Sequence, residues 1–433
     1  MSPVIIGLLG FAILFVLLGS GMSIGFAMGL IGFLGMCLLY PLPAAVAKMA
    51  ITPYHAIANY SLAVLPLFLL MAHVIFQCGF GKDLFKVAGK WLGHMRGGLA
   101  MTSIGACAAF AAVSGTSLAT AATVGLLALP EMKKRGYDPG FAAGSVAAGG
   151  SIGALIPPSG TLIIYGVLTE TSIGKLFAGA VIPAIITVIS YLATAWFLCW
   201  IKPSLGPRGE KVSFKEKVVS LKDCWELILL VCFSIGGIIL GWFTATEAGG
   251  VGAGGAILLS TLRRRLTWKK LFLAFEDTMR TTGMIYGIII GAFIFNYFVA
   301  KTTLPQAVGE WVAALAAPPM VIVSIIVVIY ILLAVVMEGP SIQLLTLPIF
   351  FPLLMGLGFD PVWFGVIQVR LLEIGLIVPP LGMCMFVVAG LDKEIPLTTV
   401  YRGCISFLVI DIVTMPIFMW WPKTVTWLPS VMK

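Results

Sequence analysis

The stretch Leu155-Ile156-Pro157-Pro158-Ser159-Gly160 (LIPPSG) lies inside an apolar run that otherwise has the length of a membrane-spanning helix. Each of the two adjacent prolines removes a backbone donor, and each ring clashes with the preceding helical turn. The same pattern recurs from Ile377 to Gly382 (IVPPLG), inside a second long apolar run. The sequence therefore predicts two discontinuous helices.

The composition is that of a polytopic membrane protein. The chain has 433 residues, 60% hydrophobic and 10% charged, and its mean hydropathy is +1.07, far above that of a water-soluble domain. Apolar runs of bilayer-spanning length recur without the alternation typical of barrel strands, so we expect an all-α fold. The net charge of +9 arises in short loops, which favours orientation signals, with contact to anionic lipids secondary, over nucleic-acid binding.

The residues that usually carry metal or enzyme chemistry are scattered. Eight cysteines and three histidines show no metal-ligand spacing. The patterns GxSxG at 149–153 and GxGxxG at 250–255 follow no strand of an α/β unit, which is the context that gives them meaning. We therefore expect no enzyme and no cofactor. Residues 1–20 lack a basic region before the apolar run, so we expect a retained span and not a cleaved signal peptide.

The order of expected helices occurs twice along the chain. The first set lies near 4–20, 23–40, 60–78, 141–168 and 174–200, with an interrupted segment at 99–129; the second lies near 224–242, 246–262, 279–299, 362–391 and 398–421, with an interrupted segment at 320–355. A shift of 222 residues places Pro130 on Pro352, Asp138-Pro139 on Asp360-Pro361, Gly153 on Gly375, Pro157-Pro158 on Pro379-Pro380 and Gly160 on Gly382. We expect repeats at 1–200 and 223–433, joined by a cytoplasmic connector at 201–222.

The charges indicate how the two halves are oriented. If each half has five crossings and one re-entrant hairpin, at 99–129 and 320–355, the odd number inverts the second half. This topology puts 21 basic residues on the cytoplasmic side and five outside, which agrees with the positive-inside bias. Both termini are then periplasmic or extracellular. Inverted repeats around discontinuous helices are typical of secondary transporters, because the unwound backbone can bind ions and substrate.

Four segments resemble the large membrane subunit of the tripartite ATP-independent periplasmic (TRAP) transporters. They are GWFTATEAGGVGAG at 241–254, PPSGTLIIYG at 157–166, FGVIQVRLLEIGLIVPPLG at 364–382 and LPLFLLMAHVIFQCGF at 65–80. The resemblance covers essentially the whole chain. It implies an elevator-type fold in the bacterial inner membrane that imports an organic acid, such as a sialic acid or a C4-dicarboxylate, with Na+ as the coupling ion.

The same resemblance implies two protein partners. One is a periplasmic substrate-binding protein, and the other is a small four-helix membrane subunit, here expected as a separate chain. A stand-alone sodium/carboxylate symporter of related hairpin architecture is the alternative. The particular acid and the sodium stoichiometry are not encoded in these motifs.

The candidate ligand-binding residues lie at the hairpin tips and helix breaks. For sodium they are Ser114, Gly115, Thr116, Gly153, Pro157, Glu338, Gly339, Gly375 and Pro379, since small residues, hydroxyls and freed carbonyls suit a hard cation. For substrate they are Pro158, Ser159, Arg370 and Pro380. The alternative for the breaks is a packed kink.

Two charged positions have structural alternatives of their own. Arg370 can bind a substrate carboxylate or close an ion pair with Glu373, three positions on. Thr244 and Glu247 have the spacing of an N-terminal capping box, and we interpret them as a structural cap and not as ligands.

Overall fold

The computed structural model describes residues 2–314, 317–334, 337 and 339–432, and this part of the chain is helical, with no strand. The α-helices are α1 (Pro3–Gly19), α2 (Ile24–Leu39), α3 (Leu42–Ile57), α4 (Val64–Gln77), α5 (Phe80–Leu92), α6 (Gly98–Ser114), α7 (Ser117–Lys134), α8 (Pro139–Ser151), α9 (Gly160–Leu168), α10 (Ile173–Ile201), α11 (Phe214–Ser220), α12 (Trp225–Ile239), α13 (Ala245–Leu262), α14 (Trp268–Lys301), α15 (Leu304–Ala314), α16 (Pro319–Ala334), α17 (Gly339–Gly356), α18 (Pro361–Gly375), α19 (Met383–Leu391), α20 (Leu397–Trp420) and α21 (Lys423–Val431).

Length and composition mark several of these helices as membrane spans. Five helical segments of the described chain are long and apolar enough to cross a bilayer: 60–77, α10, α14, α17 and α20. Shorter apolar helices accompany them, namely α1, α2, α6, α12 and α16. The expectation of an all-α polytopic membrane protein is therefore confirmed, while the inverted repeats and the elevator mechanism stay predictions.

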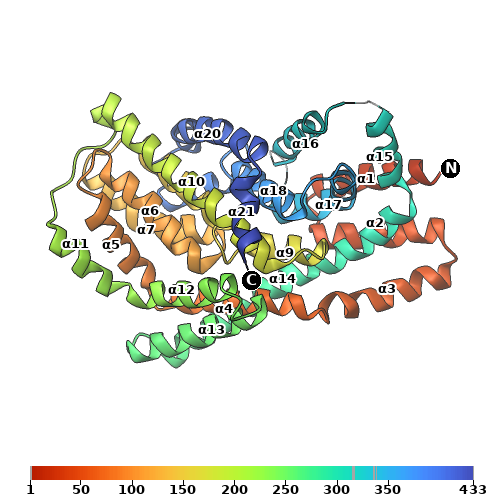
Figure 1. Cartoon of the computed structure of the whole chain (residues 1–433), viewed down its shortest axis with the longest axis horizontal. Coiled ribbons are helices and arrows are strands. Elements are labelled where there is room, and N and C mark those ends of the chain that lie inside the picture. Colours follow the sequence, from red (N-terminus) through yellow and green to blue (C-terminus); the bar gives the residue numbers. More distant parts are fainter. Residues whose placement is uncertain (1, 315–316, 335–336, 338, 433) are drawn as a thin grey trace.

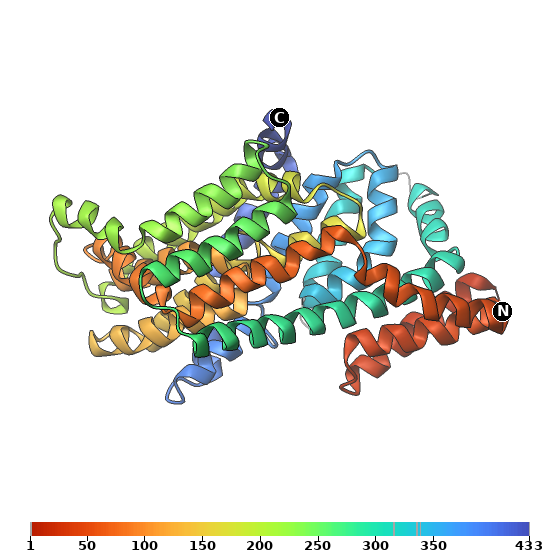
Figure 2. The same ribbon diagram turned by 90° about the horizontal axis from the view of Figure 1, so that it is seen from below.

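The first hydrophobic core contains residues of α2, α3, α4 and α14, among other helices. Helices α3 and α4 follow one another lengthwise, and the 34-residue α14 runs beside them (Figures 1 and 2). Helices α2 and α14 approach closely at glycines, where no side chain separates them. A Cβ on Gly25 would lie 2.7 Å from the Gly287 carbonyl oxygen. Such glycine contacts are the usual means of close helix packing in membranes.

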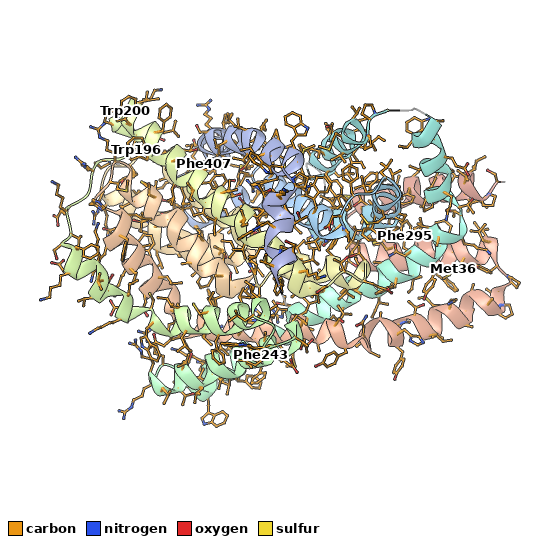
Figure 3. The ribbon with its side chains drawn as sticks, viewed as in Figure 1. Met36, Trp196, Trp200, Phe243, Phe295 and Phe407 are labelled. Atoms are coloured by element: carbon orange, nitrogen blue, oxygen red, sulfur yellow. The ribbon has the colours of Figure 1, made fainter. Side chains whose placement is uncertain are left out.

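A second hydrophobic core combines both halves of the sequence. It contains α6, α7 and α8 from the first half, α19 and α20 from the second, and the C-terminal part of α10. Figure 3 shows Phe407 of α20 among the packed helices, while Trp196 and Trp200 project outward from α10. These two indoles are 41% and 54% exposed, as expected for tryptophans facing lipid or its interface.

Both broken helices begin with the same side-chain cap. Asp138 accepts a hydrogen bond from the Phe141 N–H at 2.8 Å, and Asp360 accepts one from the Trp363 N–H at 2.9 Å. In each case proline follows at the first helical position, where its missing N–H is not needed. The two caps stand 222 residues apart, at the shift expected from the sequence.

Several helices differ from the expected set. Helices α3, α5, α15 and α21 were not expected, and α14 begins at Trp268, eleven residues before the apolar run on which the prediction relied. Helix α5 is strongly amphipathic, with lysines at 82, 86 and 90. Its periodicity is helical, but its charge content removes it from any search for long apolar runs.

Candidate functional site

The first helix break is the unwound segment between α8 and α9. A short 3-10 turn at Ile152–Ala154 follows α8, and the Pro157-Pro158 peptide bond is cis. Ser159 begins α9: its hydroxyl oxygen accepts from the Leu162 N–H at 3.2 Å, while the hydroxyl donates to the Ala154 carbonyl. The predicted break is therefore a loop whose two ends are joined by hydrogen bonds of the buried Ser159 side chain.

The tip of the first hairpin, between α6 and α7, lies directly on this break. Gly115 has a φ of +61°, and a Cβ there would lie 2.1 Å from the Pro158 carbonyl oxygen. A Cβ on Gly153 would likewise lie 2.8 Å from the Thr116 carbonyl oxygen. The two segments thus meet through backbone atoms, and glycine is required at both contacts.

Hydroxyl groups of the first tip organise the carbonyls around this contact. Ser117 donates to the Ser151 carbonyl at 2.9 Å, and Thr120 donates to the Thr116 carbonyl at 2.7 Å. Ser114, at the end of α6, shares a hydrogen bond of 2.8 Å with the Thr120 hydroxyl. Carbonyl and hydroxyl oxygens gathered in this way are the ligands that a hard cation such as sodium prefers.

The second helix break lies between α18 and α19 and also contains a cis bond, Pro379-Pro380. The hydroxyl of Tyr401 donates to the Pro380 carbonyl. Gly375 packs against the end of α16, since a Cβ there would lie 2.3 Å from the Ala334 Cβ, and Gly339 packs against Leu372. The predicted Glu338 lies outside the described residues.

The four side chains Tyr191, Arg370, Glu373 and Asp411 form what we call the charged cluster. Arg370 Nη1 donates to Glu373 Oε2 at 3.2 Å, and its Nη2 bonds Asp411 Oδ1. The Tyr191 hydroxyl donates to Asp411 Oδ2 at 2.6 Å. All four side chains are buried, on α10, α18 and α20, which lie side by side (Figure 1).

This geometry matches the ion-pair interpretation of Arg370, with a second carboxylate that sequence reasoning missed. The sequence signal was Asp411, the one aspartate in the apolar run at 398–421. Burying a charge in a membrane span costs free energy, so such a residue usually has a partner of opposite charge. The substrate role of Arg370 stays a prediction.

The charged cluster also connects the two broken helices. Glu373 Oε1, on α18, accepts a hydrogen bond from the Leu155 N–H of the first break at 2.5 Å. The same N–H also donates to the Ile152 carbonyl at 3.1 Å, within the 3-10 turn. A carboxylate from the second half of the chain therefore shares a backbone donor of the first break with that carbonyl.

A second buried network contains amides and hydroxyls. Gln343 Nε2 donates to the Thr161 carbonyl of α9 at 3.2 Å and to Gln368 Oε1 at 3.3 Å. Gln368 Nε2 in turn donates to the Tyr330 hydroxyl at 2.6 Å, and that hydroxyl also bonds Thr346. This network joins α16, α17, α18 and α9, and the sequence analysis did not identify it.

Two further predicted positions can be placed. Thr244 and Glu247 form a reciprocal capping box at the start of α13: the Thr244 N–H donates to Glu247 Oε2 at 2.8 Å, and the Glu247 N–H donates to Thr244 Oγ1 at 3.3 Å. The carboxylate and the hydroxyl thus cap the N-terminus of α13, which is the structural role expected of them.

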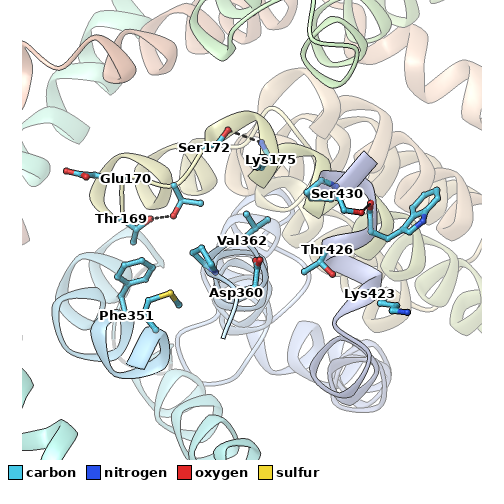
Figure 4. Close-up of a pocket in the computed structure, with 15 residues that line it drawn as sticks. Thr169, Glu170, Ser172, Lys175, Phe351, Asp360, Val362, Lys423, Thr426 and Ser430 are labelled. Carbon is cyan, nitrogen blue, oxygen red and sulfur yellow. Dashed lines mark hydrogen bonds between the residues drawn. The ribbon is translucent and has the colours of Figure 1, made fainter. Parts of the chain in front are cut away.

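One cavity lies away from these contacts. It has a volume of about 780 Å³ and lies among the start of α10, the end of α17, the start of α18 and α21 (Figure 4). Lys175 and Lys423, both expected outside the cytoplasm, line it together with Glu170 and Asp360. The predicted tip and break residues are not among its described lining residues.

This chain matches a known protein family and several known relatives. Residues 11–424 match the family described as "Tripartite ATP-independent periplasmic transporter, DctM component". The C4-dicarboxylate TRAP transporter large permease protein DctM of Pseudomonas aeruginosa is 34% identical over 94% of this chain and 92% of its own length. The sialic acid TRAP transporter large permease protein SiaM of Vibrio cholerae is 32% identical over 87% of each chain.

One solved structure shows a similar fold. The YdaH transporter of Alcanivorax borkumensis, whose crystal structure reveals an unusual topology, has a TM-score of 0.67 over 98% of both chains. At 14% sequence identity, this likeness concerns the fold alone.

Proposed function

The chain belongs to the family of DctM components of tripartite ATP-independent periplasmic transporters, which are membrane permeases and not enzymes, and from this premise we propose a mechanism. Together with its apolar helices, the family makes it a multi-pass inner-membrane protein. We propose that it is the large permease subunit of a sodium-driven system that imports an organic acid by an elevator movement. Sodium binds where hairpin tips meet helix breaks.

The observation that carries this proposal is the contact of the first hairpin tip with the first break. Gly115 lies against the Pro158 carbonyl oxygen and Gly153 against the Thr116 carbonyl oxygen, with no room for a Cβ at either glycine. Pro157 and Pro158 cannot donate to the carbonyls of Gly153 and Ala154, one turn back, and the Ala154 carbonyl accepts from the Ser159 hydroxyl instead. An unwound backbone buried in a membrane protein is tolerated where protein or a cavity surrounds it, and there it can exchange helical hydrogen bonds for ion coordination.

The substrate class follows from the relatives and from the half-helices. Two of the similar proteins are named for C4-dicarboxylate and sialic acid, and both kinds of compound carry a carboxylate. The N-termini of α9 and α19 follow the two breaks, and a helix N-terminus favours an anion through its free N–H groups and dipole. Ser159, Pro158 and Pro380 border these N-termini and are the residues proposed to contact substrate.

Two partners complete the proposed transporter: a periplasmic binding protein that delivers the acid, and a small four-helix membrane subunit. The proposed topology places both termini in the periplasm. In this orientation Lys175 and Lys423 face the binding protein's side of the membrane, and the lysines of α5 face the cytoplasm. In the elevator movement, the hairpins and broken helices travel against the helices around α4 and α14.

Uptake into proteoliposomes tests this proposal. Vesicles contain the chain and its small subunit, and a radiolabelled acid is added outside with its binding protein, with an inward gradient of either sodium or choline. Uptake that needs both sodium and the binding protein supports the tripartite mechanism. Sodium-driven uptake of free acid without the binding protein indicates the stand-alone symporter instead. Equal uptake in choline refutes sodium coupling.

A further inference from the structure

The charged cluster contains more negative than positive groups. One guanidinium, that of Arg370, faces the carboxylates of Glu373 and Asp411. All four carboxylate oxygens accept a hydrogen bond: from the Leu155 N–H and Arg370 at Glu373, and from Arg370 and the Tyr191 hydroxyl at Asp411. An ionised carboxylate is an acceptor at both oxygens, so this pattern fits two ionised groups and a net charge of −1.

A buried net charge needs compensation. The three ionisable side chains of this cluster are at most 1% exposed, and within an apolar bundle an uncompensated charge is expensive. Arg370 already binds both carboxylates, and its Nε has no partner among the described residues. A cation bound beside the cluster would supply this compensation.

Glu373 lies directly beside the first helix break. Its Oε1 lies 2.5 Å from the Leu155 nitrogen, inside the first break, whose carbonyls meet the first hairpin tip. The excess negative charge is thus placed against the backbone that we expect to hold a cation. The same hydrogen bond fixes Leu155, and with it the direction of the neighbouring carbonyls.

Among the described residues, the positions that correspond to Glu373 and Leu155 at the second break do not repeat this contact. The 222-residue shift places Glu373 on Ser151, whose hydroxyl donates to the Ala148 carbonyl at 2.8 Å. It places Leu155 on Ile377, and both N–H groups donate within a tight turn, Leu155 to the Ile152 carbonyl at 3.1 Å and Ile377 to the Ile374 carbonyl at 3.0 Å. Leu155 donates in addition to the Glu373 carboxylate. The carboxylate contact therefore distinguishes the first break from the second.

We propose that the charged cluster supplies the counter-charge for sodium at the first break, and that Glu373 is the positioning residue that holds this break in its cation-binding form. The inference rests on the proposed function, because it assigns a control of sodium affinity to that site. It predicts that the two sodium-binding regions differ in affinity, with the tighter one at the first break.

Sodium-dependent thermal stabilisation of the purified full chain tests this inference without transport. Melting temperatures are measured in NaCl and choline chloride mixtures at constant ionic strength. Glu373→Gln keeps the size of the side chain and removes one negative charge. We expect the sodium concentration for half-maximal stabilisation to rise about tenfold or more, since unit charges about 12 Å apart interact by about 1.4 kcal/mol at an effective dielectric of about 20, and closer charges by more. The melting temperature in choline should stay unchanged or increase, because the remaining Arg370–Asp411 pair is neutral.

If Glu373 has a purely structural role, the effects on melting temperature and on sodium affinity are reversed. If Glu373→Gln lowers the melting temperature in choline and leaves the half-saturating sodium concentration unchanged, the inference is wrong. Asp411→Asn tests the charge separately, since Asp411 does not touch the break: about tenfold weaker sodium binding supports the counter-charge, and unchanged binding overturns it. The matched control is Glu394→Gln, at an exposed carboxylate paired with Lys133 at 2.6 Å, which should leave sodium binding unchanged.

The experiment also separates this inference from the proposed function. If sodium does not stabilise the unsubstituted chain, sodium coupling fails and the inference fails with it. If sodium stabilises the unsubstituted chain and Glu373→Gln equally, at equal concentrations, only the inference fails.

Discussion

Substitution of Gly153 by alanine should separate the first hairpin tip from the first helix break. The added Cβ would lie 2.8 Å from both the Thr116 carbonyl oxygen and the Ser117 Cα, and 2.9 Å from the Ser117 nitrogen. All three are backbone atoms, so no side chain can turn away, and the tip has to move. Overpacking of this kind costs about 1–3 kcal/mol.

The same strain should lower the affinity for sodium, because it acts at the proposed sodium-binding contact. If the bound state requires the tip to be seated, the full cost appears in sodium affinity, as a decrease of about 5- to 150-fold for about 1–3 kcal/mol. The assay is the sodium concentration for half-maximal uptake or thermal stabilisation. Gly254→Ala in α13 is the control, because a Cβ there meets nothing within 4 Å. Unaltered sodium affinity in Gly153→Ala, with normal expression, would refute the assignment of this contact to ion binding.

Three further predictions concern stability. Thr244→Ala removes the hydroxyl of the α13 capping box and should lower the free energy of unfolding by about 1 kcal/mol, measured by thermal unfolding. Gly25→Leu places a side chain against the Gly287 carbonyl, 2.7 Å from its Cβ, and should reduce the yield of folded protein in detergent, measured by size-exclusion chromatography. Tyr137→Phe removes a hydroxyl that accepts from the Leu99 N–H at 3.0 Å and should cost about 1–3 kcal/mol, since that buried donor loses its partner; a melting temperature equal to that of the unsubstituted chain would contradict this.

The buried ions of the charged cluster contribute little net stability on general grounds. Taking charges out of water costs about as much as their attraction returns, so such groups are weak evidence of a stabilising role. Removing a partner is costly where it leaves an unpaired buried charge, which Glu373→Gln does not, because the Arg370–Asp411 pair remains. The presence of three ionisable groups at the centre of an apolar bundle is therefore better explained by ion binding at the adjacent break than by folding.

The helix breaks and caps were accessible from the sequence because their causes are local. Proline disrupts its own helical turn wherever it lies, so LIPPSG and IVPPLG marked the two unwound segments. Asp138 and Asp360 cap the turn that directly follows them, and Thr244 bonds a residue three positions away. Helices α3, α5 and α15 were missed because the search followed apolar length, and tertiary contacts stabilise helices that are too polar or too short for it.

The contacts that organise the site were decided by the tertiary structure. Glu373 and Leu155 are 218 positions apart, and Tyr191 and Asp411 are 220 apart. Helical periodicity relates residues three or four positions apart and carries no information about which helix packs alongside. The ion pair of Arg370 and Glu373 could therefore be predicted from the sequence. The contacts of Asp411 with Arg370 and of Glu373 with Leu155 could not, because they form only when the two halves pack together.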